Sequence, residues 1–140
     1  MLDSSKGHIT LPNNTVITKF TTLETINRQS DIGNTFSVDY NNGYSSAQLK
    51  KVKSNDFFFY FDFNFKEGSL NTISFTILTR EETSQTWDDW SEKNEKLKVN
   101  RQEKWLNSIL GRKRDFNWGK VSNSFDPKSG SARIVIQLKN

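Results

Sequence analysis

The sequence predicts an α+β fold: a curved antiparallel sheet of about six strands, with one long α-helix over about residues 87–110 inserted before a C-terminal hairpin. Three observations lead to this prediction. Phenylalanine occupies every second position from Phe57 to Phe65, hydrophobic residues recur at roughly helical spacing after Thr86, and period-2 alternation returns in the last third of the chain. Strands, then one helix, then two more strands is the element order of an α+β domain.

The phenylalanine-rich strand is the best-defined element. Side chains alternate between the two faces of a sheet, so the five odd-numbered rings from Phe57 to Phe65 share one face. The opposite face receives residues that become more polar along the strand: Phe58, Tyr60, Asp62, Asn64 and Lys66. Turn residues at 66–69 and renewed alternation from Ile73 predict a hairpin over residues 57–79. Charged residues flank the apolar run, so we expect this strand inside the sheet, with the helix or a neighbouring strand over its rings.

Weaker patterns predict the remaining strands. A strand pair is expected over residues 9–20 around the turn cluster Pro12-Asn13-Asn14, and residues 21–34 carry no clear pattern. Alternation over 35–40 ends at the turn signal Asn41-Asn42-Gly43, and 48–52 forms a weak strand. Alternating residues at 116–118 and 134–138 flank the turn chemistry of 126–130, which predicts a second hairpin that pairs with the first.

The long helix is bounded by recognisable end signals. Thr86 is followed three residues later by Asp89, as in a capping box, and further acidic residues crowd the first turn. Trp90, Leu97, Trp105 and Ile109 form the expected apolar stripe, with Leu106 and Leu110 beside it. Gly111 suits the left-handed residue that closes a helix, and the basic residues 112–114 complement its negative end.

Composition indicates a single domain over residues 1–140. Only 33% of the residues are hydrophobic and the mean hydropathy is −0.75, but 11 Phe and 4 Trp supply large buried areas. The net charge of +4 is common in soluble domains, although it also attracts nucleic acid. The absence of cysteine excludes disulfides, thiolate nucleophiles and zinc–thiolate sites.

The N-terminal residues bear on localisation. Residues 1–8 are polar and are expected to be a flexible start or the remnant of a trimmed N-terminal anchor. They lack the apolar core of a signal peptide, and the longest apolar run, Phe57 to Phe61, is far shorter than the ~20 residues that span a bilayer. We expect a membrane-anchored protein at the cell surface if the N-terminus has been trimmed, and a cytoplasmic protein otherwise.

The sequence supports no catalytic or ligand-binding chemistry well. His8 has no nearby nucleophile or orienting carboxylate. Asp88, Glu92 and Glu95 fall on one helical face and could hold a hard cation, or join Asp62 or Asp126 in a hydrolase, but helix-end electrostatics explain them more simply. The four tryptophans could stack on a carbohydrate, although helical spacing favours core positions. We therefore expect no catalytic residues, no enzymatic activity, no cofactor and no metal site.

The favoured interpretation is a protein-binding module. Tyrosine among small polar residues is typical of interfaces, and one sheet face is expected to carry such residues. The candidate partner-binding residues are Tyr40, Tyr44, Phe58, Tyr60, Asp62 and Asn64. The alternative is a module for single-stranded nucleic acid with a basic patch of Lys104, Arg112, Lys113, Arg114 and Lys120.

The order of motifs in residues 57–140 resembles one protein family. These motifs are Trp87-Asp88-Asp89-Trp90-Ser91, Trp105-Leu106, Leu110-Gly111, Trp118-Gly119 with Ser122, and 125–130 ahead of Ile134 and Ile136. Together they resemble the closing half of the TipC-type immunity proteins of Gram-positive bacteria, which protect against toxins exported by type VII secretion. The resemblance implies a non-enzymatic protein that binds a cognate toxin, with 1:1 stoichiometry expected, and blocks its active site. It also implies membrane contact only through an N-terminal segment, which residues 1–8 do not contain.

Overall fold

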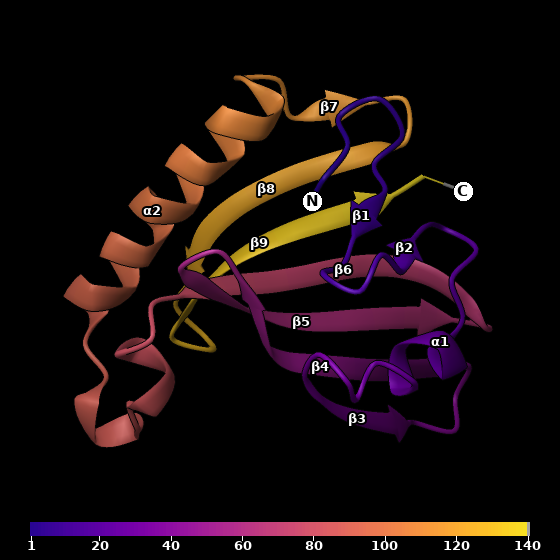
Figure 1. Cartoon of the computed structure of the whole chain (residues 1–140), viewed down its shortest axis with the longest axis horizontal. Coiled ribbons are helices and arrows are strands. Elements are labelled where there is room, and N and C mark those ends of the chain that lie inside the picture. Colours follow the sequence, from indigo (N-terminus) through magenta and orange to yellow (C-terminus); the bar gives the residue numbers. More distant parts are fainter. Residues whose placement is uncertain (140) are drawn as a thin grey trace.

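The computed structural model describes residues 1–139 and has nine strands and two α-helices in that range (Figure 1). The elements are β1 (Ile9–Thr10), β2 (Val16–Ile17), α1 (Leu23–Asn27), β3 (Asn34–Asp39), β4 (Tyr44–Ser54), β5 (Phe57–Lys66), β6 (Ser69–Leu78), α2 (Glu92–Leu110), β7 (Asp115–Phe116), β8 (Gly119–Asp126) and β9 (Ser131–Leu138). Two 3₁₀ turns, Glu82–Ser84 and Trp87–Asp89, connect β6 to α2. The predicted α+β class is confirmed.

Seven strands form one antiparallel, open and somewhat curved sheet in the order β3-β4-β5-β6-β9-β8-β7. The phenylalanine-rich strand β5 lies in its interior, as predicted, and the second hairpin joins the first through the pairing of β6 with β9. The strand predicted over 48–52 is longer than its sequence pattern indicated, because β4 spans Tyr44–Ser54 and pairs along most of β5. The strand pair predicted over 9–20 exists as the short β1–β2 ladder.

One face of this sheet, the Phe face, carries the core. Phe59, Phe61, Phe63 and Phe65 are each at most 2% exposed, and Phe61 packs with its ring centroid 5.3 Å from that of Phe75. Helix α2 covers the half of this face that includes β6, β8 and β9, where Trp105 contacts the rings of Phe59 and Phe75. Helix α1 covers the half that includes β3 and β4, and the N-terminal segment with β1 and β2 crosses the sheet nearer β6 and β9, as Figure 1 shows.

The N-terminal residues do not form the flexible start that their polar composition predicted. Leu2 is 6% exposed within the core and bridges to Ile9. The indole N–H of Trp118 donates to the carbonyl oxygen of Ser4 at 2.8 Å, and Gly7 packs against the same ring. Burial of one apolar residue, Leu2, and contacts with the Trp118 ring in the β7–β8 turn are enough to hold this polar segment.

Beyond Phe75, strands β6 and β9 separate, and α2 takes the place of the missing strand pairing. The paired residues end at Phe75 and Ile134. At Ile77 the backbone N–H donates to Oε1 of the fully buried Gln102 at 3.1 Å, and the carbonyl oxygen accepts from Arg101 at 3.0 Å. Gln102 also donates to Asn123 of β8 at 3.0 Å. Side chains of α2 thus satisfy backbone groups that would otherwise be buried without partners.

Helix α2 begins at Glu92, five residues after its predicted start. Thr86 and Asp89 do form a capping interaction, in which the Thr86 N–H donates to the Asp89 carboxylate at 2.9 Å, but it closes only a 3₁₀ turn. Ser91 is the actual N-cap. The predicted apolar stripe is also wrong in its first half, because Trp90 precedes the helix and Leu97 is 53% exposed. Glu95 and Gln102 are buried there instead, where the separated strands present polar backbone groups.

We expect Phe61→Ala to lower the free energy of unfolding by about 3–5 kcal/mol, because it removes a ring that is 1% exposed and in contact with three others. Urea denaturation monitored by circular dichroism measures this change. Phe36→Ala is the matched control, since Phe36 is 61% exposed on an edge strand and its loss should change stability by less than about 0.5 kcal/mol. Equal effects of the two substitutions would contradict the assignment of the faces.

Candidate partner-binding surface

The second face of the sheet, called here the polar face, is not covered by either helix. Its rows follow from the strand register: Phe36 lies beside Gln48, Gln48 beside Asp62, Asp62 beside Ser74, and Ser74 beside Val135. All six residues predicted to bind a partner are on this face, on adjacent strands or at their ends: Tyr40, Tyr44, Phe58, Tyr60, Asp62 and Asn64. The structure therefore brings the predicted set together on one surface.

Hydrogen bonds and packing hold the central residues of the polar face in place. Arg133 of β9 donates to the carboxylate of Asp62 at 2.8 Å and to the Ser74 hydroxyl at 3.2 Å. Tyr60 is half-buried, and this burial raises the pKa of its hydroxyl above the ordinary value of 10.0. Phe58 is half-buried beneath the Arg80 guanidinium. The centre of this face is thus an ordered set of aromatic and small polar groups.

The edge of the polar face carries basic residues that were not predicted as part of the site. Lys53 pairs with Phe58, Lys66 with Tyr44, and Lys120 with Gln137, so all three belong to this face. Lys50 lines a shallow cavity with Tyr60 and Asp62. Within residues 1–139, none of these four lysines forms an ion pair. Lys50 follows Gln48 on this face by ordinary alternation, but the bulge between Leu49 and Val52 is needed to bring Lys53 to the same face, so alternation alone could not have found Lys53.

A groove of about 510 Å³ opens at the end of the polar face where β6 and β9 separate. Its walls come from three parts of the chain: the strands, the segment 79–91 and the first turns of α2. Tyr60 and Arg133 line it from the sheet, Trp87 and Trp90 from the segment, and Lys98 from the helix. Trp87 is 76% exposed and Trp90 is 43% exposed, with their ring centroids 6.4 Å apart. Both were predicted as core residues, and that prediction is wrong.

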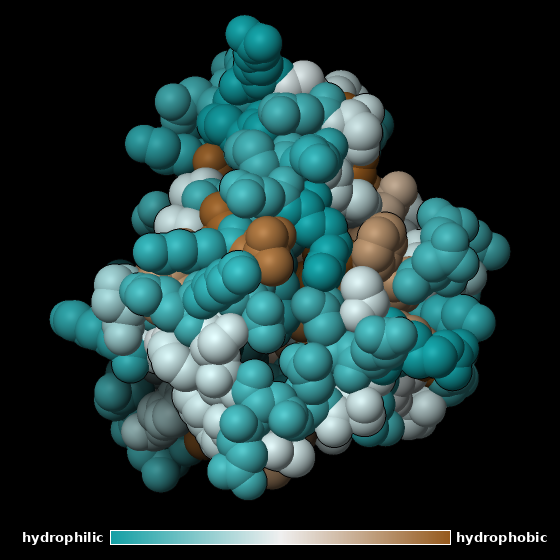
Figure 2. All heavy atoms as spheres, turned by 90° about the vertical axis from the view of Figure 1, so that its left-hand side faces the viewer, coloured by the Kyte–Doolittle hydropathy of each residue, from teal (hydrophilic) through white to brown (hydrophobic). Residues whose placement is uncertain are grey.

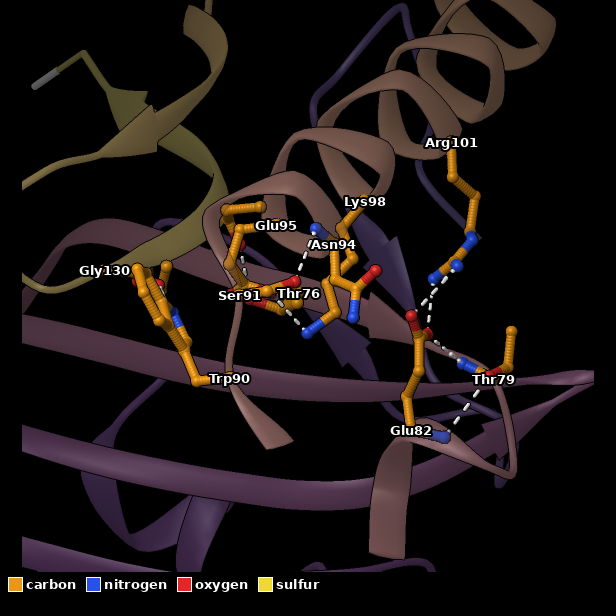
Figure 3. Close-up of polar contacts among 12 residues, drawn as sticks. Thr76, Thr79, Glu82, Trp90, Ser91, Asn94, Glu95, Lys98, Arg101 and Gly130 are labelled. Atoms are coloured by element: carbon orange, nitrogen blue, oxygen red, sulfur yellow. Dashed lines mark hydrogen bonds and ion pairs between the residues drawn. The ribbon is translucent and has the colours of Figure 1, made fainter. Parts of the chain in front are cut away.

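Ionic and hydrogen-bonded contacts attach the segment 79–91 to the rest of the structure (Figure 3). Arg101 of α2 donates two hydrogen bonds to the Glu82 carboxylate, at 2.6 and 3.1 Å, and Glu82 also accepts from the Thr79 N–H at 2.8 Å. The indole N–H of Trp90 donates to the Gly130 carbonyl oxygen at 2.6 Å, which joins the segment to the β8–β9 turn. The segment is therefore fixed at both of its ends.

The alternative basic patch is not assembled as one surface. Arg114 is engaged with Gly111, Asn107 and Glu103, and the Lys113 ammonium lies over the Phe116 ring. Lys104 and Arg112 are exposed at the C-terminal half and end of α2, which packs on the Phe face. Lys120 belongs to the polar face, on the opposite side of the sheet. The structure thus separates the five residues, and of these five only Lys120 lies on the polar face.

The other candidate residues from the sequence are dispersed. His8 lines a shallow cavity with Lys6 and Trp118, and no carboxylate is among its described lining residues. Asp88 and Glu92 are exposed, whereas Glu95 is buried and paired with Lys98 at 2.5 Å. Within residues 1–139, no three His, Cys, Asp or Glu residues gather in a way that could hold a metal ion. Neither helix in that range combines the length and apolar character needed to cross a bilayer.

Seen from the side on which α2 lies, the surface is mostly hydrophilic, with scattered hydrophobic atoms rather than one broad hydrophobic patch (Figure 2). No protein-family model matches the sequence, and searches of curated proteins and of solved structures found no significant similarity. The geometry of the polar face and the groove is therefore the basis for a functional proposal.

We expect Glu82→Gln to lower the free energy of unfolding by roughly 2 kcal/mol at neutral pH, because it breaks a charged pair that includes half-buried side chains. Burial alone would raise the pKa of Glu82, but hydrogen bonds from Arg101 and the Thr79 N–H and the charges of Arg101 and Lys98 together lower it below 4.5. A lowered pKa stabilises the folded state above pH 4.5, and this contribution is lost as the pH falls through the folded value.

The test compares urea denaturation of the two proteins between pH 7 and pH 3. The difference in stability should be constant above pH 5 and should shrink as the pH drops below about 4.5. Glu81→Gln is the matched control, since Glu81 is exposed and should show almost no difference at any pH. If the loss of stability caused by Glu82→Gln does not change with pH, the ionic attachment of the segment 79–91 is contradicted.

Proposed function

We propose that this chain is an immunity-type binding protein that neutralises a cognate secreted bacterial toxin by occluding its active site with the polar face. The observation that carries the proposal is a sheet face left uncovered by both helices and lined by tyrosines among small polar residues. Such a surface offers aromatic anchors at low entropic cost and hydrogen-bonding groups between them. The order of motifs in residues 57–140, which resembles that of TipC-type immunity proteins, supports the same class.

The charges of the polar face indicate the chemistry of the toxin surface. Within residues 1–139, four lysines at its edge form no ion pair, whereas the central Asp62 is neutralised by Arg133. A partner with carboxylates around its active site would meet these lysines and would be attracted over long range. Binding is one toxin to one chain, at the cell surface if an N-terminal anchor precedes this domain and in the cytoplasm otherwise.

Tyr60→Ala is expected to weaken the complex with the toxin by roughly 2 kcal/mol or more, about 30-fold in Kd, because Tyr60 is an aromatic anchor at the centre of the face. The toxin for this test is the secreted product of a neighbouring gene that co-purifies with the tagged chain. Biolayer interferometry gives the affinity, and circular dichroism checks that the variant is folded.

Phe20→Ala is the control, because Phe20 is 79% exposed in the N-terminal segment on the other side of the sheet. It should bind the toxin as the wild-type protein does. A toxin that binds Tyr60→Ala normally and Phe20→Ala weakly would place the interface on the other side of the molecule.

The second candidate is binding of single-stranded nucleic acid on the same face. It is favoured by Lys66 and Lys120 lying on the face that carries Tyr40 and Tyr44, where bases could stack and phosphates be neutralised. A fluorescent thymidine oligonucleotide tests it, since its affinity should fall by about 0.7 log unit per log unit of salt for each phosphate contact. Saturable, salt-dependent binding of the oligonucleotide without any toxin partner would favour this candidate over the first.

A further inference from the structure

The two tryptophans of the groove differ from the other two tryptophans of the chain, which pack against the core. Trp105 and Trp118 pack against the core, and Phe61 and Phe75 are almost fully buried. Trp87, by contrast, leaves 76% of its surface exposed. Exposed tryptophan is among the residues most enriched in the energetically dominant contacts of protein interfaces, together with Tyr and Arg. Trp87, Trp90, Tyr60 and Arg133 all line this one groove.

The groove is held open before any partner binds. Its outer wall is attached through Glu82 to Arg101 and through Trp90 to Gly130, as Figure 3 shows. Ser91 caps α2 by accepting from the Asn94 N–H at 3.1 Å, which fixes the bend between the segment and the helix. A preformed groove loses little conformational entropy on binding, so more of the contact energy appears as affinity. Its volume of about 510 Å³ is in the range of sites that enclose ligand groups.

Every charged side chain that lines the groove already has a partner within the chain. Glu82 pairs with Arg101, Glu95 with Lys98, and Arg133 with Asp62. The Asp89 carboxylate accepts from the Thr86 N–H. An anionic group entering the groove would lose its hydration without finding an unpaired cation, because Lys98 and Arg133 are already paired, and this loss is costly. An uncharged aromatic or apolar group would instead gain contact with the two indole rings.

We propose that this groove is the anchor site of the protein partner and receives an uncharged aromatic or apolar side chain from a protruding loop of it. The proposal rests on the proposed function, since it assigns a second contact region to the same toxin. The polar face and the groove meet at Tyr60, Leu78 and Arg133, so one partner can cover both. The groove contact determines the lifetime of the complex. Buried anchor residues mainly change the dissociation rate, whereas charges at the edge of an interface mainly change the association rate.

The first experiment measures dissociation of the co-purified toxin from two groove variants. Trp87→Ala removes one indole, and Asn94→Trp fills the groove from α2 at an exposed position whose amide side chain forms no hydrogen bond within residues 1–139. Each should accelerate dissociation about 30-fold or more and leave the association rate within about threefold. The controls are Phe20→Ala, an exposed ring elsewhere, and Asn100→Trp, an exposed position of α2 that does not line the groove.

The results separate the two proposals. A toxin that binds, is weakened by Tyr60→Ala and dissociates normally from both groove variants would overturn the anchor site and leave the proposed function intact. Failure of every neighbouring gene product to bind would overturn the proposed function, and with it this assignment of the groove to a toxin. Faster dissociation from the groove variants alone, with both controls unchanged, supports the anchor site.

The second experiment needs no toxin and tests the chemistry of the groove directly. The four tryptophans are labelled as 5-fluorotryptophan, assigned by single Trp→Phe variants and followed by fluorine NMR. N-acetyl-L-tryptophanamide, an uncharged aromatic probe, should shift the Trp87 and Trp90 resonances saturably and leave those of Trp105 and Trp118 unchanged. N-acetyl-L-aspartic acid α-amide has the same capped backbone but a negatively charged side chain. It should shift none of the four tryptophan resonances. Equal responses to both probes, or none to either, would overturn the preference for an uncharged group.

Discussion

Gln102 holds α2 against the sheet at the point where β6 and β9 separate, and the rest of the molecule depends on this contact. Strands that diverge leave backbone N–H and C=O groups without ladder partners, and such groups are costly when buried. Gln102 and Arg101 satisfy both groups of Ile77, and Gln102 extends the bridge to Asn123 of β8. The helix is thereby fixed over the Phe face. The polar face stays uncovered, and the gap between the strands becomes the groove.

The sequence predicted those parts of the fold that local periodicity determines. Alternation from Phe57 to Phe65 separated the two faces of β5, and the charged residues that flank the apolar run indicated that the strand lies inside the sheet. Phe58, Tyr60, Asp62 and Asn64 lie on the polar face because of this alternation, and Tyr40 and Tyr44 join them from the neighbouring hairpin. Local sequence patterns could not predict the features that depend on pairing with distant strands. The bulge near Lys51, with φ of 60°, changes which lysines share a face, and the divergence of β6 from β9 buries Glu95 and Gln102 instead of an apolar stripe.

Trp87 and Trp90 show why residue type alone does not locate a tryptophan. The capping interaction of Thr86 with Asp89 is real, yet it closes a 3₁₀ turn rather than the start of α2, so both rings fall outside the helix. Their position is set by the contacts of Glu82 with Arg101 and of Trp90 with Gly130, which join residues distant in the sequence. We thus interpret the surface as two regions with different physical roles. In the function that we propose, lysines at the edge attract an acidic partner, and the groove retains it through contacts that salt screens little.

The most direct test of the account is hydroxyl-radical footprinting of the chain with and without its co-purified toxin. The account predicts that Tyr40, Tyr44 and Trp87 lose reactivity in the complex, because they are exposed on the polar face and in the groove. Phe20 and Leu97, which are also exposed but lie outside both regions, should react as in the free protein. Protection of Phe20 or Leu97 with unchanged reactivity of the other three residues would contradict the account.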